Sequence, residues 1–244
     1  MPRGHIAALS FEAGDRNPVV STIADKVGGI VQIRPSTEAV LSLHPDLVVM
    51  QAGALAKLHT NLAALGVPVL ELPYDSSIAD IRRTTTMLGA RLGAPDKAAK
   101  LLRDMDATLA LARAEAPRPA VRTLIYEPNG YASSGGLTEA LMNVAGLVNA
   151  APGFAPTRTG TIPVEEVIAA APELLILSGE RRTMDAQANL VQHHPALAAL
   201  THSYVAWAPL IPTLCAGPWS ADAAVTFAEL GQKARRAHKQ ALGD

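Results

Sequence analysis

Aromatic side chains are the residues of this chain whose positions most clearly suggest a binding chemistry. The 244 residues include only three Phe, four Tyr and two Trp. Five of these aromatics lie in or beside segments that follow predicted strands: Tyr74, Tyr126, Tyr131, Trp207 and Trp219. Ligands of open parallel sheets bind beyond the carboxyl ends of the strands, and aromatic rings stack on flat ligands. We therefore predict that these rings line a binding cleft, with a partly buried strand position as the alternative for Tyr126 and Trp207.

Arginine side chains fall near the same predicted cleft. Arg158, Arg181 and Arg182 could each pair with a carboxylate or another oxyanion of a ligand, and a solvated surface position is the alternative for each. We include Arg158 among the predicted ligand-binding residues. The glycine-containing loop 126–136 matches neither GxGxxG nor GxxxxGK[ST], so it is not predicted to bind phosphate.

Residues typical of catalysis or metal binding do not form a recognised pattern. The sequence contains no GxSxG or HExxH motif. Cys215 is the only cysteine and has no base nearby in sequence, which favours an inert thiol. The doublet His193-His194, with His59 and His202, would form a metal site only if three or four ligands converged. We therefore predict no catalytic residue, no metal ligand and no cofactor.

A repeated phrase organises the elements that must position these side chains. Residues 37–50 read TEAVLSLHPDLVVM, and residues 164–177 read VEEVIAAAPELLIL. In each copy a short helix is ended by a proline, and the apolar run that follows suits a strand covered on both faces. Thr37 and Glu38 are expected to open the first helix. A second matching pair, 62–73 and 197–209, follows in the same order, so two similar α/β lobes are predicted.

Two helices are predicted between the copies. The first has an apolar stripe over 78–92, a cap at Ser76 or Ser77, and an end at Gly93. The second begins at Pro95 and buries a stripe made of Ala98, Leu101, Leu102, Met105, Leu109 and Ala112. We predict an N-terminal α/β lobe over 1–93, a connecting helix over 94–117 and a C-terminal α/β lobe over 118–244. Residues 121–128 are the predicted first strand of the second lobe.

Composition excludes several classes of partner. The formal net charge is −1 and the basic residues are scattered, so nucleic acid is not an expected ligand. No apolar run approaches the roughly 20 residues of a membrane-spanning helix. The first residues, MPRGHIAALSFEAGD, lack the basic-then-apolar layout of a secretory signal.

Several phrases together resemble the class III substrate-binding proteins of ABC importers, which deliver ferric siderophores, haem and cobalamin. The resemblance extends from His5 onward and is carried by TEAVLSLHPDLVVMQAG, LAALGVPVLELP, YEPNGYASSGGLTEALMNVAGLVNAA, VEEVIAAAPELLIL and CAGPWSADAAVTFAEL. It implies two Rossmann-like lobes with parallel sheets joined by one long helix, and a ligand held between the lobes. It also implies a periplasmic monomer that docks on a membrane permease through acidic residues.

The sequence departs from the pattern of this class in two places. The secretion signal and a first strand and helix with an SLxPxxTE-like phrase are missing before His5, so the N-terminal lobe is expected to be truncated and to expose an apolar sheet edge. The position matching the first docking carboxylate falls near Ala56-Lys57, which is not acidic. Neither docking residue is therefore assigned.

The resulting prediction is a non-enzymatic protein that captures an iron–siderophore for an ABC importer. Cobalamin or haem is the alternative ligand within the class. A two-lobed metallocluster enzyme is the alternative from another class, although cluster ligation usually needs several cysteines. A third alternative is a defective remnant of such a binding protein that no longer binds a ligand.

Overall fold

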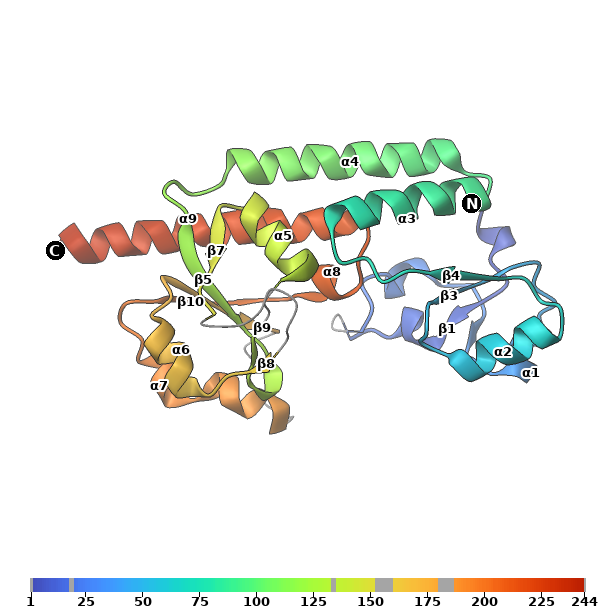
Figure 1. Ribbon diagram of the computed structural model, residues 1–244, viewed down its shortest axis with the longest axis horizontal. Helices are drawn as coiled ribbons and strands as arrows, with labels where there is room; N and C mark the ends of the chain where they lie inside the picture. Colours follow the sequence, from blue (N-terminus) through green and yellow to red (C-terminus); the bar gives the residue numbers. More distant parts are fainter. Residues whose placement is uncertain (1, 18–19, 133–134, 152–159, 180–186, 244) are drawn as a thin grey trace. The chain divides into compact units, whose positions relative to one another are not determined.

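The computed structural model describes the whole chain except residues 1, 18–19, 133–134, 152–159, 180–186 and 244 (Figure 1). The chain forms two compact units. The first unit comprises Met1–Tyr74 and Thr86–Asp96, and the second comprises Asp75–Thr85 and Lys97–Asp244. Each is an α/β unit with parallel strands, as the sequence predicted.

The first unit contains two separate pairs of parallel strands. Strand β1 (Leu9–Ser10) pairs with β2 (Gln32–Ile33), and β3 (Val48–Gln51) pairs with β4 (Val69–Leu72). The helices are η1 (Arg3–His5), η2 (Phe11–Gly14), η3 (Ala24–Lys26), α1 (Thr37–Leu41) and α2 (Ala56–Ala64). The core is small: Val40, Leu58 and Leu62 are buried, and side chains such as Val48 and Met50 pack against them.

Helix α1 and strand β3 form the first copy of the repeated phrase, with two differences from the prediction. The helix is capped by Ser36, whose Oγ accepts a hydrogen bond from the Ala39 amide at 3.1 Å, whereas Thr37 Oγ1 accepts one from Asn61 Nδ2. Strand β3 is not covered on both faces, because Val49 is 42% exposed. The prediction of a fully covered strand was wrong here: Val48 and Met50 pack against the core cluster, whereas Val49 points to the opposite face and is left exposed.

Helices α3 (Ile78–Arg91) and α4 (Pro95–Ala114) follow the predicted pattern closely. Ser77 caps α3 by accepting the Asp80 amide at 3.1 Å, and Gly93 has a φ of 61°, which suits a residue that ends a helix. In helix α4, four residues of the predicted stripe are buried, Leu102 is partly buried and Leu101 is 47% exposed. From Lys97 onward this predicted connecting helix belongs to the second unit.

The second unit is built on a larger sheet. Strands β7 (Leu147–Asn149), β5 (Val121–Tyr126), β9 (Leu174–Ser178) and β10 (Tyr204–Ala208) pair in parallel. Strands β6 (Tyr131–Ala132) and β8 (Gly160–Thr161) extend it in antiparallel fashion from the end of β5. The helices are η4 (Pro128–Gly130), α5 (Gly136–Val144), α6 (Val164–Ala170), η5 (Gln187–His193), α7 (Pro195–Ala198), α8 (Ile211–Leu214), η6 (Pro218–Ser220) and α9 (Ala221–Gly243).

Both faces of this sheet are covered, with α5 and α9 on one side and α6 and α7 on the other (Figure 1). Successive residues of β9 therefore enter different clusters: Leu174 and Ile176 face one, and Leu175 and Leu177 face the other. For β9, the prediction of a strand covered on both faces is confirmed. None of the helices in the described residues is long and apolar enough to span a membrane.

Candidate functional site

Trp219 is the predicted ligand-binding residue that the structure presents most openly in the second unit. It lies in η6, in the segment that follows the carboxyl end of β10, and its side chain is 53% exposed. Its Nε1 donates a hydrogen bond to the Cys215 carbonyl at 2.8 Å. The ring lies against Gly217, where an added Cβ would come within 2.3 Å of its Cζ2. The indole is thus held in one orientation with exposed surface available for a ligand.

Tyr131 also has an exposed side chain, at 44%, and its position depends on a tight turn. The chain reverses at Asn129 and Gly130, which have φ angles of 59° and 79°. Gly130 is needed because a Cβ there would lie 3.1 Å from Tyr126 Oη and 3.2 Å from the Ile162 carbonyl. The turn allows β6 to pair with β5 and β8, which leaves Tyr131 at the carboxyl end of β5.

Tyr126 belongs to the core of the second unit. It has no exposed surface, and its hydroxyl donates to the Ile162 carbonyl at 3.0 Å. Burial raises the pKa of this phenol, and the nearby Glu165 carboxylate adds to the shift. A ligand cannot reach the ring in this structure, so the geometry favours the alternative of a buried strand residue.

Trp207 is covered by a short helix that the sequence did not predict. Its ring stacks on His193 of η5, with the centroids 5.0 Å apart and an interplanar angle of 29°. The preceding residue, Gln192, is buried and donates from Nε2 to the carbonyls of Tyr126 and Ser178 at 2.8 and 3.0 Å. Helix η5 therefore closes the carboxyl ends of β5 and β9. The sequence indicated the His193-His194 doublet only as a candidate for metal binding, and the helix before it was not predicted.

Tyr74 is the predicted site residue of the first unit, and it follows β4 with 72% of its surface exposed. Its neighbour Asp75 begins the second unit and is buried, where it accepts a hydrogen bond from Thr84 Oγ1 at 2.7 Å. Arg158, Arg181 and Arg182 lie outside the described residues.

Two features at strand ends were missed by sequence reasoning. Leu214 of α8 is 59% exposed, and α8 contacts η6, which carries Trp219. In the first unit, Phe11 and Arg34 directly follow β1 and β2, and the Arg34 Cζ lies 4.3 Å from the centre of the Phe11 ring. Strands of two residues are too short to show a sequence period, so neither position was recognised as a strand exit.

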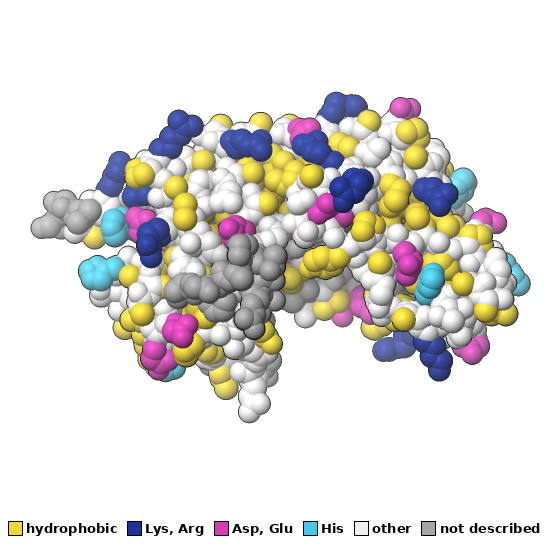
Figure 2. Space-filling view, viewed as in Figure 1, with side chains coloured by type: hydrophobic (Ala, Val, Ile, Leu, Met, Phe, Trp, Pro, Cys, Tyr) yellow, Lys and Arg dark blue, Asp and Glu magenta, His cyan; other side chains and the backbone are white. Residues whose placement is uncertain are grey.

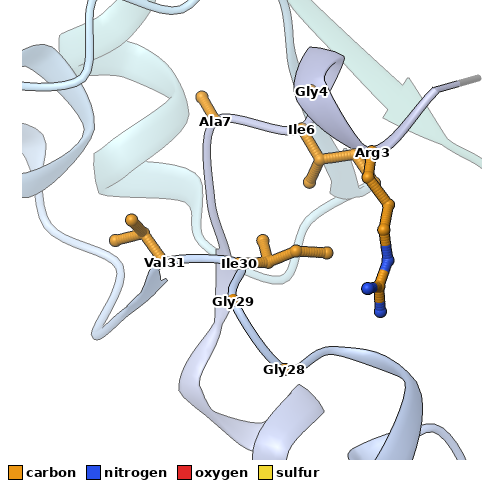
Figure 3. Close-up of a pocket in the computed structure, with 8 residues that line it drawn as sticks. All are labelled: Arg3, Gly4, Ile6, Ala7, Gly28, Gly29, Ile30 and Val31. Carbon is orange, nitrogen blue, oxygen red and sulfur yellow. The ribbon is translucent and has the colours of Figure 1, made fainter.

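A surface cavity of about 340 Å³ lies in the first unit at the opposite ends of these strands (Figure 3). It is lined by residues that precede β1 and β2: Arg3, Gly4, Ile6, Ala7, Gly28, Gly29, Ile30 and Val31. The Arg3 guanidinium donates to the Lys26 carbonyl. Because ligands of parallel sheets bind at the carboxyl ends, this cavity is not the predicted site.

Charge on the visible face of the molecule is dispersed. Lys and Arg side chains are interspersed with acidic and hydrophobic ones and form no continuous basic patch on the face in Figure 2. Several cations are paired, such as Arg82 with Asp106 and Lys100 with Asp104. Among the described residues, no three His, Cys, Asp or Glu side chains gather in a way that could hold a metal ion.

A model of the periplasmic binding protein family matches residues 13–203, and the chain belongs to this family. This finding confirms the resemblance to class III substrate-binding proteins of ABC importers, which are solute-binding proteins and not enzymes. Comparison with curated protein sequences gives no match.

Three similar solved structures show the same fold. The periplasmic heme-binding protein RhuT from Roseiflexus sp. RS-1 has a TM-score of 0.71 and 20% identity, over 87% of this chain and 88% of that chain. The periplasmic heme-binding protein HutB of Vibrio cholerae has a TM-score of 0.71 and 15% identity, over 86% and 87%. An ABC-type Fe3+-hydroxamate transport system protein from Saccharomonospora viridis has a TM-score of 0.61 and 22% identity, over 81% and 72%.

Proposed function

We propose that this protein is the non-enzymatic substrate-binding component of an ABC importer and that its ligand is an iron–siderophore or a related iron complex. Membership of the periplasmic binding protein family supports the transport role. Similar folds in two heme-binding proteins and in an Fe3+-hydroxamate transport protein support an iron-containing ligand. Haem and cobalamin are the rival ligands within the class.

The observation that carries this proposal is the fixed and exposed indole of Trp219 in the segment after β10. A large aromatic ring at 53% exposure loses the benefit of burial unless another molecule covers it. Its hydrogen bond to Cys215 and its contact with Gly217 hold the ring in place before a ligand arrives. Such pre-organisation lowers the entropic cost of binding.

Tyr74, Tyr131 and Arg158 are the further proposed ligand walls. The two tyrosine rings are exposed and follow the carboxyl ends of β4 and β5. Tyr126 and Trp207 are proposed to support the fold beside the site without contacting the ligand. Tyr126 is buried, and Trp207 is packed against His193.

The function is tested by titrating the purified chain and following tryptophan fluorescence with correction for ligand absorbance. The ligands are ferric hydroxamate, catecholate and carboxylate siderophores, haem and cyanocobalamin. We expect saturable quenching by one class at micromolar concentration or below. A folded chain that responds to none of them would contradict the proposal.

A pair of tryptophan variants assigns the site. We expect Trp219→Ala to weaken binding roughly ten- to a hundredfold, since covering such a ring contributes roughly 1.5–3 kcal/mol. Trp207→Phe is the matched control and should leave affinity unchanged, because Trp207 contacts His193 within the fold. Isothermal titration of both variants checks this, and equal losses would remove Trp219 from the site.

A periplasmic location and a membrane permease as partner are proposed on the same grounds, together with a monomeric state. Reconstitution with a candidate permease, in which the loaded protein stimulates ATP hydrolysis more than the empty one does, would test the partnership.

A further inference from the structure

The first unit holds a guanidinium group at the end of its β1–β2 sheet. Because β1 and β2 are parallel and in register from Leu9 opposite Gln32, the residues that follow them, Phe11 and Arg34, come side by side. The Arg34 Cζ lies 4.3 Å from the Phe11 ring centre, which is the geometry of a cation–π contact. Both side chains are exposed.

The carboxylate of Glu12, whose pKa responds to the charge of Arg34, has another hydrogen-bond partner. Glu12 accepts a hydrogen bond from Ser10 Oγ. That bond is the main cause of the lowered pKa of the Glu12 carboxyl, and the charge of Arg34 makes the smallest contribution. Within the part of the chain that the structure describes, no ion pair or hydrogen bond joins Arg34 to another residue. The ring thus positions a guanidinium whose N–H donors have no protein acceptor among those residues.

We propose that Arg34, positioned by Phe11, binds a carboxylate of the ligand, and that the transported substrate is therefore an iron complex with carboxylate groups at its periphery. A planar guanidinium matches a carboxylate with two parallel hydrogen bonds, and an aromatic ring beneath it leaves its edge free for them. The position agrees with the rule that ligands bind at the carboxyl ends of parallel strands. This inference rests on the proposed function and narrows its ligand class to carboxylate siderophores and haem.

The test compares haem with its dimethyl ester, which differs from haem only in its carboxylates. Haem and its dimethyl ester are titrated into the full chain under identical solvent conditions, and ferric citrate represents iron complexes without a porphyrin. We expect Arg34→Gln to weaken the carboxylate ligand roughly ten- to a hundredfold and to leave the ester within about twofold, as charge-assisted hydrogen bonds imply. If the chain binds ferric citrate and not haem, the carboxylate that Arg34 binds belongs to an iron complex without a porphyrin.

Three further variants separate positioning from charge. Arg34→Lys keeps the charge without the planar fork and should give an intermediate loss, and Phe11→Leu should weaken the carboxylate ligand and spare the ester. Arg91→Gln removes one exposed charge from the same unit and should change nothing. Thermal melts confirm that each variant is folded.

The failures of the two proposals are distinguishable. If the chain binds haem and its ester equally and Arg34→Gln binds as the parent does, the carboxylate inference is overturned and the transport role stands. The same holds if only a hydroxamate complex or cyanocobalamin binds. If the folded chain binds no member of the full panel, both proposals are overturned.

Discussion

Strands β3 and β9 arise from nearly the same phrase and lie in different surroundings. Val49 of β3 and Ile176 of β9 occupy the same position of the repeat, yet Val49 is 42% exposed and Ile176 is completely buried. Strand β9 has β5 on one side and β10 on the other, and helices cover both faces of the sheet. Strand β3 pairs with β4 alone among the described residues, and the core beside it contains three buried side chains.

This difference shows that a local phrase determines the type of element, whereas its neighbours determine its burial. Both copies form a short helix and then a strand that pairs in parallel with the next strand of the chain. A two-stranded sheet beside a small core contributes little stability, while a larger sheet covered on both faces contributes much more. We therefore expect the second unit to dominate the stability of the protein.

The largest expected effect is at the equivalent positions Val49 and Ile176. Ile176→Thr places a hydroxyl among buried apolar side chains and removes a methyl group, so it should lower the free energy of unfolding by about 2–4 kcal/mol. Val49→Thr keeps the β-branched shape on an exposed face and should change it by less than about 0.5 kcal/mol. Urea denaturation followed by circular dichroism measures both, and equal losses would mean that both strands are covered.

A second comparison concerns two glutamine side chains that bond carbonyls at strand ends. Gln192 is buried and bonds two carbonyls, whereas Gln51 is exposed and donates to the Leu72 carbonyl at 3.3 Å. Gln192→Leu should lower the free energy of unfolding by about 1–3 kcal/mol, because two inward carbonyls lose their donor. Gln51→Leu should have little effect in the same denaturation experiment. A large loss from Gln51→Leu alone would reverse the comparison.

A smaller effect concerns the caps of the two equivalent helices. Ser36 caps α1 with its hydroxyl, while Pro163 precedes α6 without a side-chain cap. Ser36→Ala should lower the free energy of unfolding by about 1 kcal/mol, and Ser36→Thr should restore most of it, because threonine retains the accepting oxygen. Pro163→Ala should lower the free energy of unfolding by less than Ser36→Ala does. The same unfolding measurement checks the three variants.

The smallest effect is the pH dependence of Asp80 in α3. Hydrogen bonds with Ser77 and then with Arg83 lower the pKa of this carboxyl from 3.8 to about 2. Because the folded-state pKa is depressed, the stabilisation is present above pH 4 and is lost as the pH falls toward 2. Ser77→Ala should raise the pKa of Asp80, which carbon-13 NMR titration of the carboxyl would show. An unchanged pKa would leave Arg83 and Ser76 as the causes of the lowered pKa.

Much of the fold was accessible from the sequence because it depends on local patterns. The proline after each repeat helix, the Ser77 cap and the Gly93 stop each act within a few residues, and the structure places them as predicted. The apolar stripe of α4 is also periodic, and four of its predicted residues are buried. The exposure of Val49 and the burial of Tyr126 depend on residues far away in the sequence, so they were less accessible.

The candidate site was predicted only in part. Tyr74, Tyr131 and Trp219 follow strands, as the sequence predicted, and the structure shows that they are exposed. Their contact with a ligand stays a prediction. Tyr126 and Trp207 also occur at strand ends, but Gly130 brings the chain back over the one and η5 covers the other. The pairing of Phe11 with Arg34 joins residues 23 positions apart across a sheet of two-residue strands, and no sequence period marks it.

The sequence by itself determined the two α/β units and their repeated helix–strand order, because these depend on residue types at short spacing. The family was identified from the resemblance of several sequence phrases to known members. The tertiary structure alone decided which copy of the repeat is buried, which aromatic rings are exposed and which side chain accompanies Arg34. Those properties depend on strand pairing and on packing between segments far apart in the chain, and a short window of sequence does not contain them.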